Sequence, residues 1–160
     1  METLSFVDKS EWSRGPWDQE PDRVYWRDQE TGLPCLVLRG PMGAWCGYVA
    51  VPPTHPYHGK RYSDCILSPD CGESYCDHGV DFNVHGGITY AAGCQEDDKE
   101  QGVCHVPEPG QPDDVWWFGF DCAHHWDLMP MLDFTFSNVY RDLAFVQTEV
   151  GKLAQQMGDV

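Results

Sequence analysis

Two stretches of the sequence concentrate the residue types that carry acid-base chemistry. The first, VWWFGFDCAHHWDLMP at positions 115–130, holds three tryptophans, two aspartates, a cysteine and two adjacent histidines. The second, VHGG at positions 84–87, places a histidine beside two glycines. Histidine titrates near neutral pH, and a neighbouring carboxylate fixes its tautomer. We therefore expect the two stretches to line one pocket, in which Asp121 and either His124 or His125 pair with His85. If the protein is an enzyme, His85, Asp121 and His124 are the expected catalytic residues. The alternative is a buried structural hydrogen bond between the same groups.

The glycines and aromatic residues around this pocket favour a ligand site. Paired glycines weaken a strand, but they let a ligand or another backbone come close. Strand alternation in WWFGFDCAHH places Trp117, Gly119 and Asp121 on one face, whereas the face with Phe118 and Phe120 is apolar enough to meet a helix. A tryptophan, a gap and a carboxylate would suit a flat ring stacked beside a hydrogen-bond acceptor. The ligand-binding residues expected from this pattern are His85, Gly86, Gly87, Tyr90, Trp117 and Asp121.

Few cations are available to meet an anionic ligand. The cations nearest to the expected strands and helix start are Arg39, Lys60, Arg61 and Arg141. Arg141 falls in the first turns of the expected helix, where backbone N–H groups also favour anions. We take Arg141 and Lys60 as candidate phosphate contacts, with pairing of Arg141 to Asp133 or Asp142 as the alternative.

Cysteines and histidines in two loop segments form a candidate zinc site. The ligands would come from two groups: Cys71 and Cys76 with His78, and Cys94 and Cys104 with His105. These are ligand types that zinc uses, although the spacings differ from those of a CxxC knuckle, and reduced thiols are the alternative. His85, Asp121 and His124 could instead hold a catalytic metal with an open position. Cys122 could act as a nucleophile, but a strand cysteine is more often a small apolar residue.

A sheet and one helix would have to position these residues. Alternating or apolar runs punctuated by glycine and proline predict strands over 23–28, 33–40, 43–52, 82–92 and 114–124. Short links make the sheet mostly antiparallel. An apolar stripe from Val139 to Met157 predicts a C-terminal amphipathic helix with Ser137 as its N-cap. We expect a polar N-terminal arm over 1–21 and a single α+β domain over 22–160, with about five strands and a long Cys-rich loop region.

The composition restricts the partners. Ten Lys and Arg against 26 Asp and Glu give a net charge of −16, which argues against binding duplex nucleic acid or an anionic membrane surface. No stretch approaches the ~18 apolar residues of a membrane span, and the first residues lack the features of a signal peptide. We therefore expect a cytoplasmic protein whose cysteines are mostly thiols. An exposed sheet edge would also permit a homodimer.

Four motifs in sequential order resemble those of a group of small phage, prophage and bacterial proteins. They are CGYVAVPPTHPYHGKRY, VHGGITY, CHVPEPGQPDDVWWFGFDCAHHWDLMP and YRDLAFVQTEVGKLAQQM, which correspond to GYV-VP-HP-G-Y, HGG-T-aromatic, W-GFDCAH and YRD patterns. The resemblance covers about residues 30–157. It implies a shared origin and architecture, and a phage-type protein would act in the host cytoplasm. It directs attention to these positions: His85, Gly86, Gly87, Asp121, His124, Tyr140, Arg141 and Asp142.

The leading functional hypothesis is a small-molecule binder that sequesters a nucleotide-derived immune messenger. In it, Trp116 or Trp117 and Tyr90 would stack on a base, with Tyr140 beside the site. His85 and Asp121 would form hydrogen bonds with the polar edge of the base, and Arg141 or Lys60 would contact phosphate. Tyr140, Arg141 and Lys60 thus complete the set of candidate ligand-binding residues. One alternative is a hydrolase or phosphodiesterase that uses the His/Asp site, with or without a metal. Another is an acidic protein-protein inhibitor that acts through its exposed carboxylates.

Overall fold

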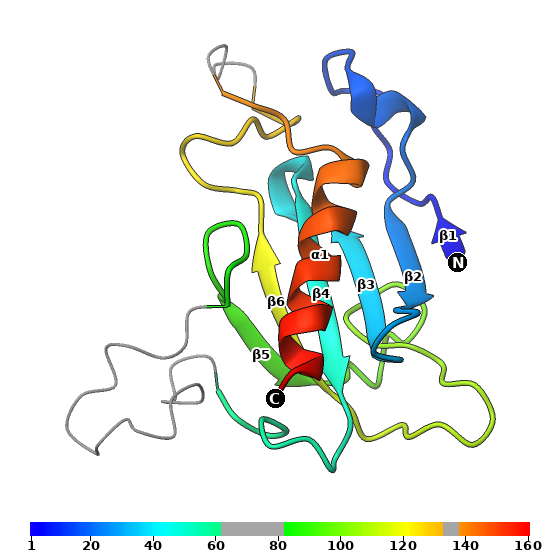
Figure 1. Cartoon of the computed structure of the whole chain (residues 1–160). Coiled ribbons are helices and arrows are strands. Elements are labelled where there is room, and N and C mark those ends of the chain that lie inside the picture. Colours follow the sequence, from blue (N-terminus) through cyan, green and yellow to red (C-terminus); the bar gives the residue numbers. More distant parts are fainter. Residues whose placement is uncertain (62–81, 133–137) are drawn as a thin grey trace.

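One antiparallel sheet and a C-terminal helix make up the fold (Figure 1). The computed structural model of the chain describes residues 1–61, 82–132 and 138–160. The strands are β1 (Glu2–Leu4), β2 (Arg23–Arg27), β3 (Pro34–Arg39), β4 (Trp45–Val51), β5 (Tyr90–Gly93) and β6 (Trp116–Asp121). The helix is α1 (Leu143–Gly158), and two short 3₁₀ turns are η1 (Pro16–Gln19) and η2 (Pro41–Gly43). The predicted α+β class is confirmed.

The sheet has six strands in the order β1-β2-β3-β4-β6-β5, and every neighbouring pair is antiparallel. The sixth strand, beyond the five or so expected, is β1 from the polar N-terminal arm. The arm is tied to the sheet by the buried carboxylate of Asp22, which accepts hydrogen bonds from the backbone N–H groups of Phe6 and Val7, both at 2.8 Å. Short-range alternation could not reveal β1, because its three residues are all exposed at the sheet edge.

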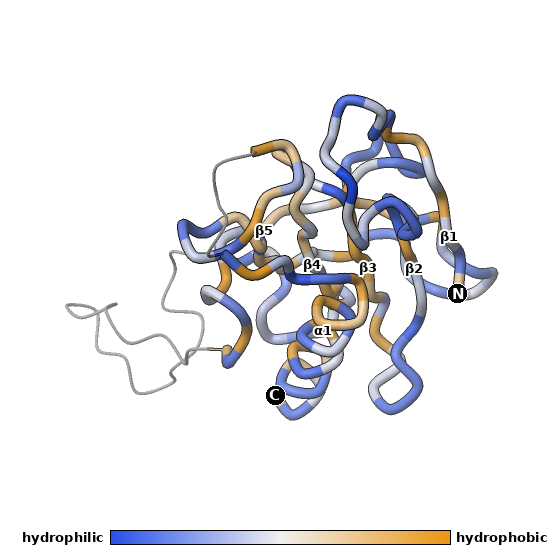
Figure 2. Tube along the Cα trace, turned by 90° about the horizontal axis from the view of Figure 1, so that it is seen from above, coloured by the Kyte–Doolittle hydropathy of each residue, from blue (hydrophilic) through white to orange (hydrophobic). Residues whose placement is uncertain are grey.

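Helix α1 packs across β3 and β4 and encloses the larger core (Figure 1). Phe118, Phe120 and Cys122 lie in this core, as the strand alternation predicts, against helix residues such as Val150. Gly47 in β4 permits the close approach, since an added Cβ would lie 2.6 Å from a methyl group of Val150. Figure 2 shows hydrophobic and hydrophilic residues alternating around α1, as expected for a helix with one buried face.

The helix begins later than its apolar stripe suggests. It starts at Leu143, and Asp142 is the N-cap, its side chain accepting a hydrogen bond from the backbone N–H of Phe145 at 2.8 Å. The predicted cap, Ser137, lies outside the described residues. Val139 is exposed and forms an isolated bridge with Asp127, so its place in the predicted stripe is wrong. The stripe extended too far because Val139 matches the helical spacing by residue type alone.

The segment between β5 and β6 covers the second face of the sheet. Val103 and Val115 from this segment pack with Trp117 and with the sheet residues Tyr25 and Tyr48 in a second buried cluster. Both faces of the sheet are therefore covered. The segment over 82–92, predicted to be one strand, is extended and paired only from Tyr90, because a tight turn interrupts its first half.

Candidate functional site

His85 lies in a tight turn that precedes β5. The backbone N–H of Gly87 donates to the carbonyl of Val84 at 3.0 Å, and Gly86 has a φ of 71°. A positive φ at the third position of a β-turn favours glycine, as in a type II turn. An added Cβ at Gly86 would also overlap the imidazole of His124. Both the positive φ and the contact with His124 therefore favour glycine at position 86. Because Gly86 has no side chain, His124 can pack against the turn that carries His85.

The carboxylate of Asp127 stands at the centre of the site and is fully buried. It accepts hydrogen bonds from His85 Nε2 at 2.9 and 3.0 Å, from His124 Nδ1 at 3.0 Å and from Arg141 Nε at 3.0 Å. The backbone N–H of His124 donates to it at 3.1 Å. One buried carboxylate thus fixes two imidazoles and a guanidinium. We call His85, His124, Asp127 and Arg141 the histidine cluster.

These hydrogen bonds keep Asp127 ionised. Burial is the largest single influence and would raise the pKa of the carboxyl group. The hydrogen bonds from His85, Arg141 and His124 together outweigh burial, so the pKa lies below the ordinary value of 3.8. The cluster therefore contains a carboxylate throughout the neutral pH range.

The histidine cluster reaches the surface beside an aromatic ring. The imidazole of His124 stacks on the indole of Trp126, with ring centroids 4.7 Å apart and an interplanar angle of 5°. Trp126 is 44% exposed, while His85, His124 and Arg141 are partly exposed. Phe145 of α1 contacts both His85, at 5.3 Å between ring centroids, and the guanidinium of Arg141 at 5.0 Å. The polar groups therefore meet solvent next to a flat apolar surface.

Helix α1 also holds the backbone of the turn. The side chain of Glu149, buried on the helix face, accepts a hydrogen bond from the backbone N–H of His85 at 3.0 Å. Lys152 Nζ donates to the other Glu149 oxygen at 2.8 Å. The helix thus positions His85 directly, which the apolar stripe alone did not indicate.

The YRD motif is divided among three structural tasks. The hydroxyl of Tyr140 donates to Glu20 at 2.5 Å and accepts from Arg39 Nη1 at 2.7 Å, so it joins the N-terminal arm to the segment before α1. Arg141 binds Asp127, and Asp142 caps the helix. Arg141 is the member of this motif that belongs to the histidine cluster. Of the alternative partners expected for Arg141, Asp142 caps the helix instead, and Asp133 lies outside the described residues.

Asp121 takes a different place from the one expected. It accepts hydrogen bonds from Thr89 Oγ1 at 3.2 Å and from the backbone N–H of Ala123 at 3.0 Å. Its carboxylate lies 4.0 Å from His124 Nε2, and no hydrogen bond joins it to His85 among the described residues. The pairing of both histidines with Asp121 is therefore corrected to a pairing with Asp127.

Three other candidates lie away from the histidine cluster. Trp117 is fully buried in the second core cluster, so it offers no exposed face for the stacking expected of it. Tyr90 packs edge-on against Tyr48, with ring centroids 5.2 Å apart. The carbonyl of Lys60 accepts from Trp116 Nε1 at 2.7 Å, and within the described residues no hydrogen bond or ion pair joins Lys60 to the cluster. The face of β6 that carries Trp117 was predicted to line the site, but the segment between β5 and β6 covers this face.

Asp127 and Trp126 are the site residues that the sequence reasoning missed. The signal available was the spacing of His124 and Asp127, three residues apart in HHWD. Such a spacing lets a side-chain carboxylate turn back to the backbone N–H and ring of the histidine. Residue type and spacing could suggest this local pair, but the meeting with His85 depends on the fold.

Two groups of residues in the described structure have the composition of a metal site. In one, donor atoms of His85, His124 and Asp127 all lie within 4.8 Å of one another. In the other, the same holds for Cys94, Cys104 and His105. Two imidazoles and a carboxylate are ligands that catalytic zinc uses. In this structure the ring nitrogens of His85 and His124 are hydrogen-bonded to the carboxylate of Asp127.

Among the described cysteines, Cys35, Cys46 and Cys122 are free thiols, in line with the expectation that most are thiols. Cys94 and Cys104 form a disulfide, whereas Cys71 and Cys76, with His78, lie outside the described residues. Burial raises the pKa of the Cys122 thiol, so this side chain is a core residue rather than a nucleophile.

No helix of the described residues is both long and apolar enough to cross a membrane. Comparison of the chain with protein-family models, with curated proteins and with solved structures gave no match.

Proposed function

We propose that this chain binds a small polar molecule with an anionic group at the surface formed by the histidine cluster and Trp126. The observation that carries the proposal is the buried carboxylate of Asp127, which holds two imidazoles and a guanidinium side by side. Side chains fixed in this way present their remaining polar atoms in one arrangement, which lowers the cost of ordering them around a ligand.

A nucleotide-type molecule fits this chemistry. The exposed indole of Trp126 offers a flat ring for a base. Arg141 binds Asp127 through Nε, and its Nη groups make no hydrogen bond with any described residue, so they can donate to a phosphate. The motif resemblance to phage proteins makes a nucleotide-derived immune messenger the specific ligand that we propose, with sequestration as the function.

One observation favours a second candidate, a hydrolase or phosphodiesterase. When both imidazoles are neutral and donate to Asp127, the hydrogens lie on His85 Nε2 and His124 Nδ1. The lone pairs then lie on the other nitrogen of each ring. Protonation of one of these histidines would give a base beside an acid, which is the pair that cleavage of a phosphodiester needs.

Native mass spectrometry of the full chain purified from cells, followed by denaturation, tests both candidates. A binder releases an intact small molecule, whereas an enzyme converts added substrate and loses turnover when His124 becomes alanine. Tryptophan fluorescence then measures the affinity for nucleoside monophosphates and for cyclic mono- and dinucleotides. Trp126→Ala should weaken binding at least tenfold, because it removes the flat ring on which a base would stack, and His58→Ala should leave the affinity unchanged.

No released molecule and no response to these nucleotides would overturn the proposed binding function. Equal affinities in Trp126→Ala and the wild type would overturn the location of the site.

A further inference from the structure

His105 lies in the second core cluster without a polar partner. Its side chain is 3% exposed, and neither ring nitrogen has a hydrogen-bond partner among the described residues. The ring stacks near Tyr25, with centroids 5.5 Å apart, and meets the edge of Trp117 at 5.6 Å. Buried polar groups are normally hydrogen-bonded, so an unpartnered imidazole at this depth calls for a ligand.

Two sulfur atoms lie next to this imidazole. Donor atoms of Cys94, Cys104 and His105 are all within 4.8 Å of one another. Cys104 is buried, and it is disulfide-bonded to Cys94 at the end of β5. One nitrogen and two sulfurs form a ligand set that zinc uses, with a fourth position left for water or another group.

The loop that connects the cysteines keeps its shape through bonds of its own. The backbone N–H of Gln95 donates to the carbonyl of Val103 at 3.0 Å, and Val103 N–H donates to Gln95 Oε1 at 2.9 Å. Gly102 N–H donates to the carbonyl of Asp98 at 2.9 Å. These bonds join the two ends of the loop next to Cys94 and Cys104.

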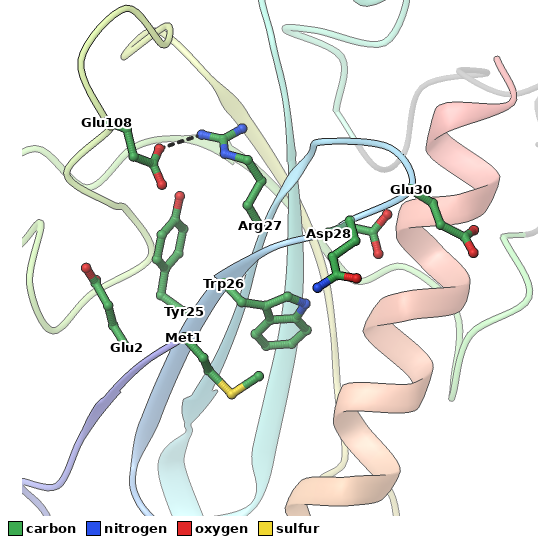
Figure 3. A pocket seen from close by; sticks show the side chains of 9 residues that line it. Met1, Glu2, Tyr25, Trp26, Arg27, Asp28, Glu30 and Glu108 are labelled. Carbon is green, nitrogen blue, oxygen red and sulfur yellow. Dashed lines mark hydrogen bonds and ion pairs between the residues drawn. The ribbon is translucent and has the colours of Figure 1, made fainter.

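His105 borders a cavity. This cavity of about 330 Å³ is also lined by Tyr25 and Glu2, among others. Glu2 and Tyr25 also line a neighbouring groove of about 700 Å³, in which Figure 3 shows Glu2 near Tyr25 and Glu108 paired with Arg27. The wall of the cavity carries Arg23 and Lys99 as well as Glu2 and Glu100, so the approach to His105 has mixed charge.

We propose that reduction of the Cys94–Cys104 disulfide creates a zinc site formed by Cys94, Cys104 and His105. A dithiol reductant supplies two electrons and two protons, which convert the disulfide into two thiols and leave the reductant as a disulfide. Zinc then binds the two sulfurs as thiolates, and the two thiol protons pass to solvent. The imidazole binds as the neutral base, through a ring nitrogen that has no hydrogen-bond partner among the described residues.

The disulfide and the zinc site exclude each other, because the same two sulfurs serve both. The loop over 94–104 would be closed by a covalent bond in the oxidised protein and by the metal in the reduced protein. Metal binding at this site would therefore report the redox state of the protein.

Cobalt(II), a spectroscopic substitute for zinc, tests the proposal on the full chain. After reduction and removal of the reductant without oxygen, one equivalent should give thiolate-to-cobalt charge-transfer bands and the visible bands of a tetrahedral site. The oxidised protein should not give this site. Cys94→Ser with Cys104→Ser should abolish it, and His105→Gln should weaken cobalt binding at least tenfold. Cys46→Ser, a change to a free cysteine outside the cluster, is the matched control and should bind as the wild type does.

The oxidised His105→Gln variant provides the folding check, since its disulfide still closes the loop. A reduced wild type that binds no cobalt would overturn the proposal. So would a cobalt spectrum that survives the double cysteine change, or a folded His105→Gln variant with undiminished affinity.

Discussion

Gly86 shows how one residue type can meet two demands at the same point. Its φ of 71° is in the left-handed region, and the imidazole of His124 occupies the space where a Cβ would lie. Gly87 has a similar φ of 77° but open space around its Cα. A side chain at Gly87 would therefore cost only the strain of the backbone conformation, whereas a side chain at Gly86 would also displace His124.

Replacing each glycine by alanine should give unequal losses of stability. Gly87→Ala should lower the free energy of unfolding by about 1 kcal/mol, the cost of a left-handed conformation for a residue with a Cβ. Gly86→Ala adds overlap with the His124 ring and should cost about 2–4 kcal/mol. Urea unfolding of both variants measures the difference. Equal losses would contradict the close packing of His124 on the turn.

At the scale of elements, the site depends on α1 more than on any strand. Asp142 caps the helix, Glu149 holds the backbone of His85, and Phe145 packs against its ring. Arg141, immediately before the cap, reaches Asp127. The same helix that closes the core thus sets the position of the histidine cluster.

Removal of the helix cap should weaken the whole element. Asp142→Ala should lower the free energy of unfolding by about 1 kcal/mol, because the N–H of Phe145 loses its acceptor. Asp142→Asn keeps a side-chain oxygen and should lie close to the wild type. Asp159→Ala, at the other end of the helix, is the control and should cost little, since an acidic group near a helix C-terminus is unfavourable. Thermal unfolding followed by circular dichroism compares them, and a cost of Asp159→Ala as large as that of Asp142→Ala would contradict the capping role.

At the scale of the whole molecule, two buried carboxylates bind the outer segments to the sheet and helix. Asp22 holds the N-terminal arm through Phe6, Val7 and Lys9, and Asp127 holds the histidine cluster. For both carboxyl groups, burial is the largest influence and raises the pKa, but hydrogen bonds outweigh it. Both pKa values lie below 3.8. Both groups therefore contribute stability that depends on pH.

Acidification should remove this contribution. A group whose pKa is lower in the folded state is stabilising above its unfolded pKa, near 3.8, and its contribution is lost as pH falls through the folded pKa. Each such group adds a slope of up to about 1.4 kcal/mol per pH unit in this window. Urea midpoints between about pH 6 and pH 2.5 should fall less steeply in Asp22→Asn and Asp127→Asn than in the wild type.

The comparison with a control is needed because the chain carries a net charge of −16, and protonation of surface carboxylates relieves repulsion at the same time. Asp114→Asn removes a carboxylate whose side chain is 83% exposed. It should keep the wild-type slope. If Asp22→Asn and Asp127→Asn also show the wild-type slope of urea midpoint against pH, the carboxyl groups of Asp22 and Asp127 do not have lowered pKa values.

The sequence by itself determined the fold class, five of the strands and the apolar face of α1. These features depend on periodicity within a few residues, which residue type reports directly. It also predicted one pocket for His85 and the histidines at 124 and 125, but their meeting depends on the fold. At Gly86 the positive φ belongs to the local turn, whereas the contact with His124 depends on the fold.

Only the tertiary structure decided which carboxylate joins the two histidines and which tryptophan lies beside them. Asp121 and Asp127 have the same side chain, and Trp117 and Trp126 do too, so their residue types cannot distinguish them. The difference lies in long-range packing: the loop between β5 and β6 buries Trp117, while the chain after β6 brings Asp127 beside His85 and Arg141. Such contacts join residues far apart in the chain, and local patterns carry no information about them.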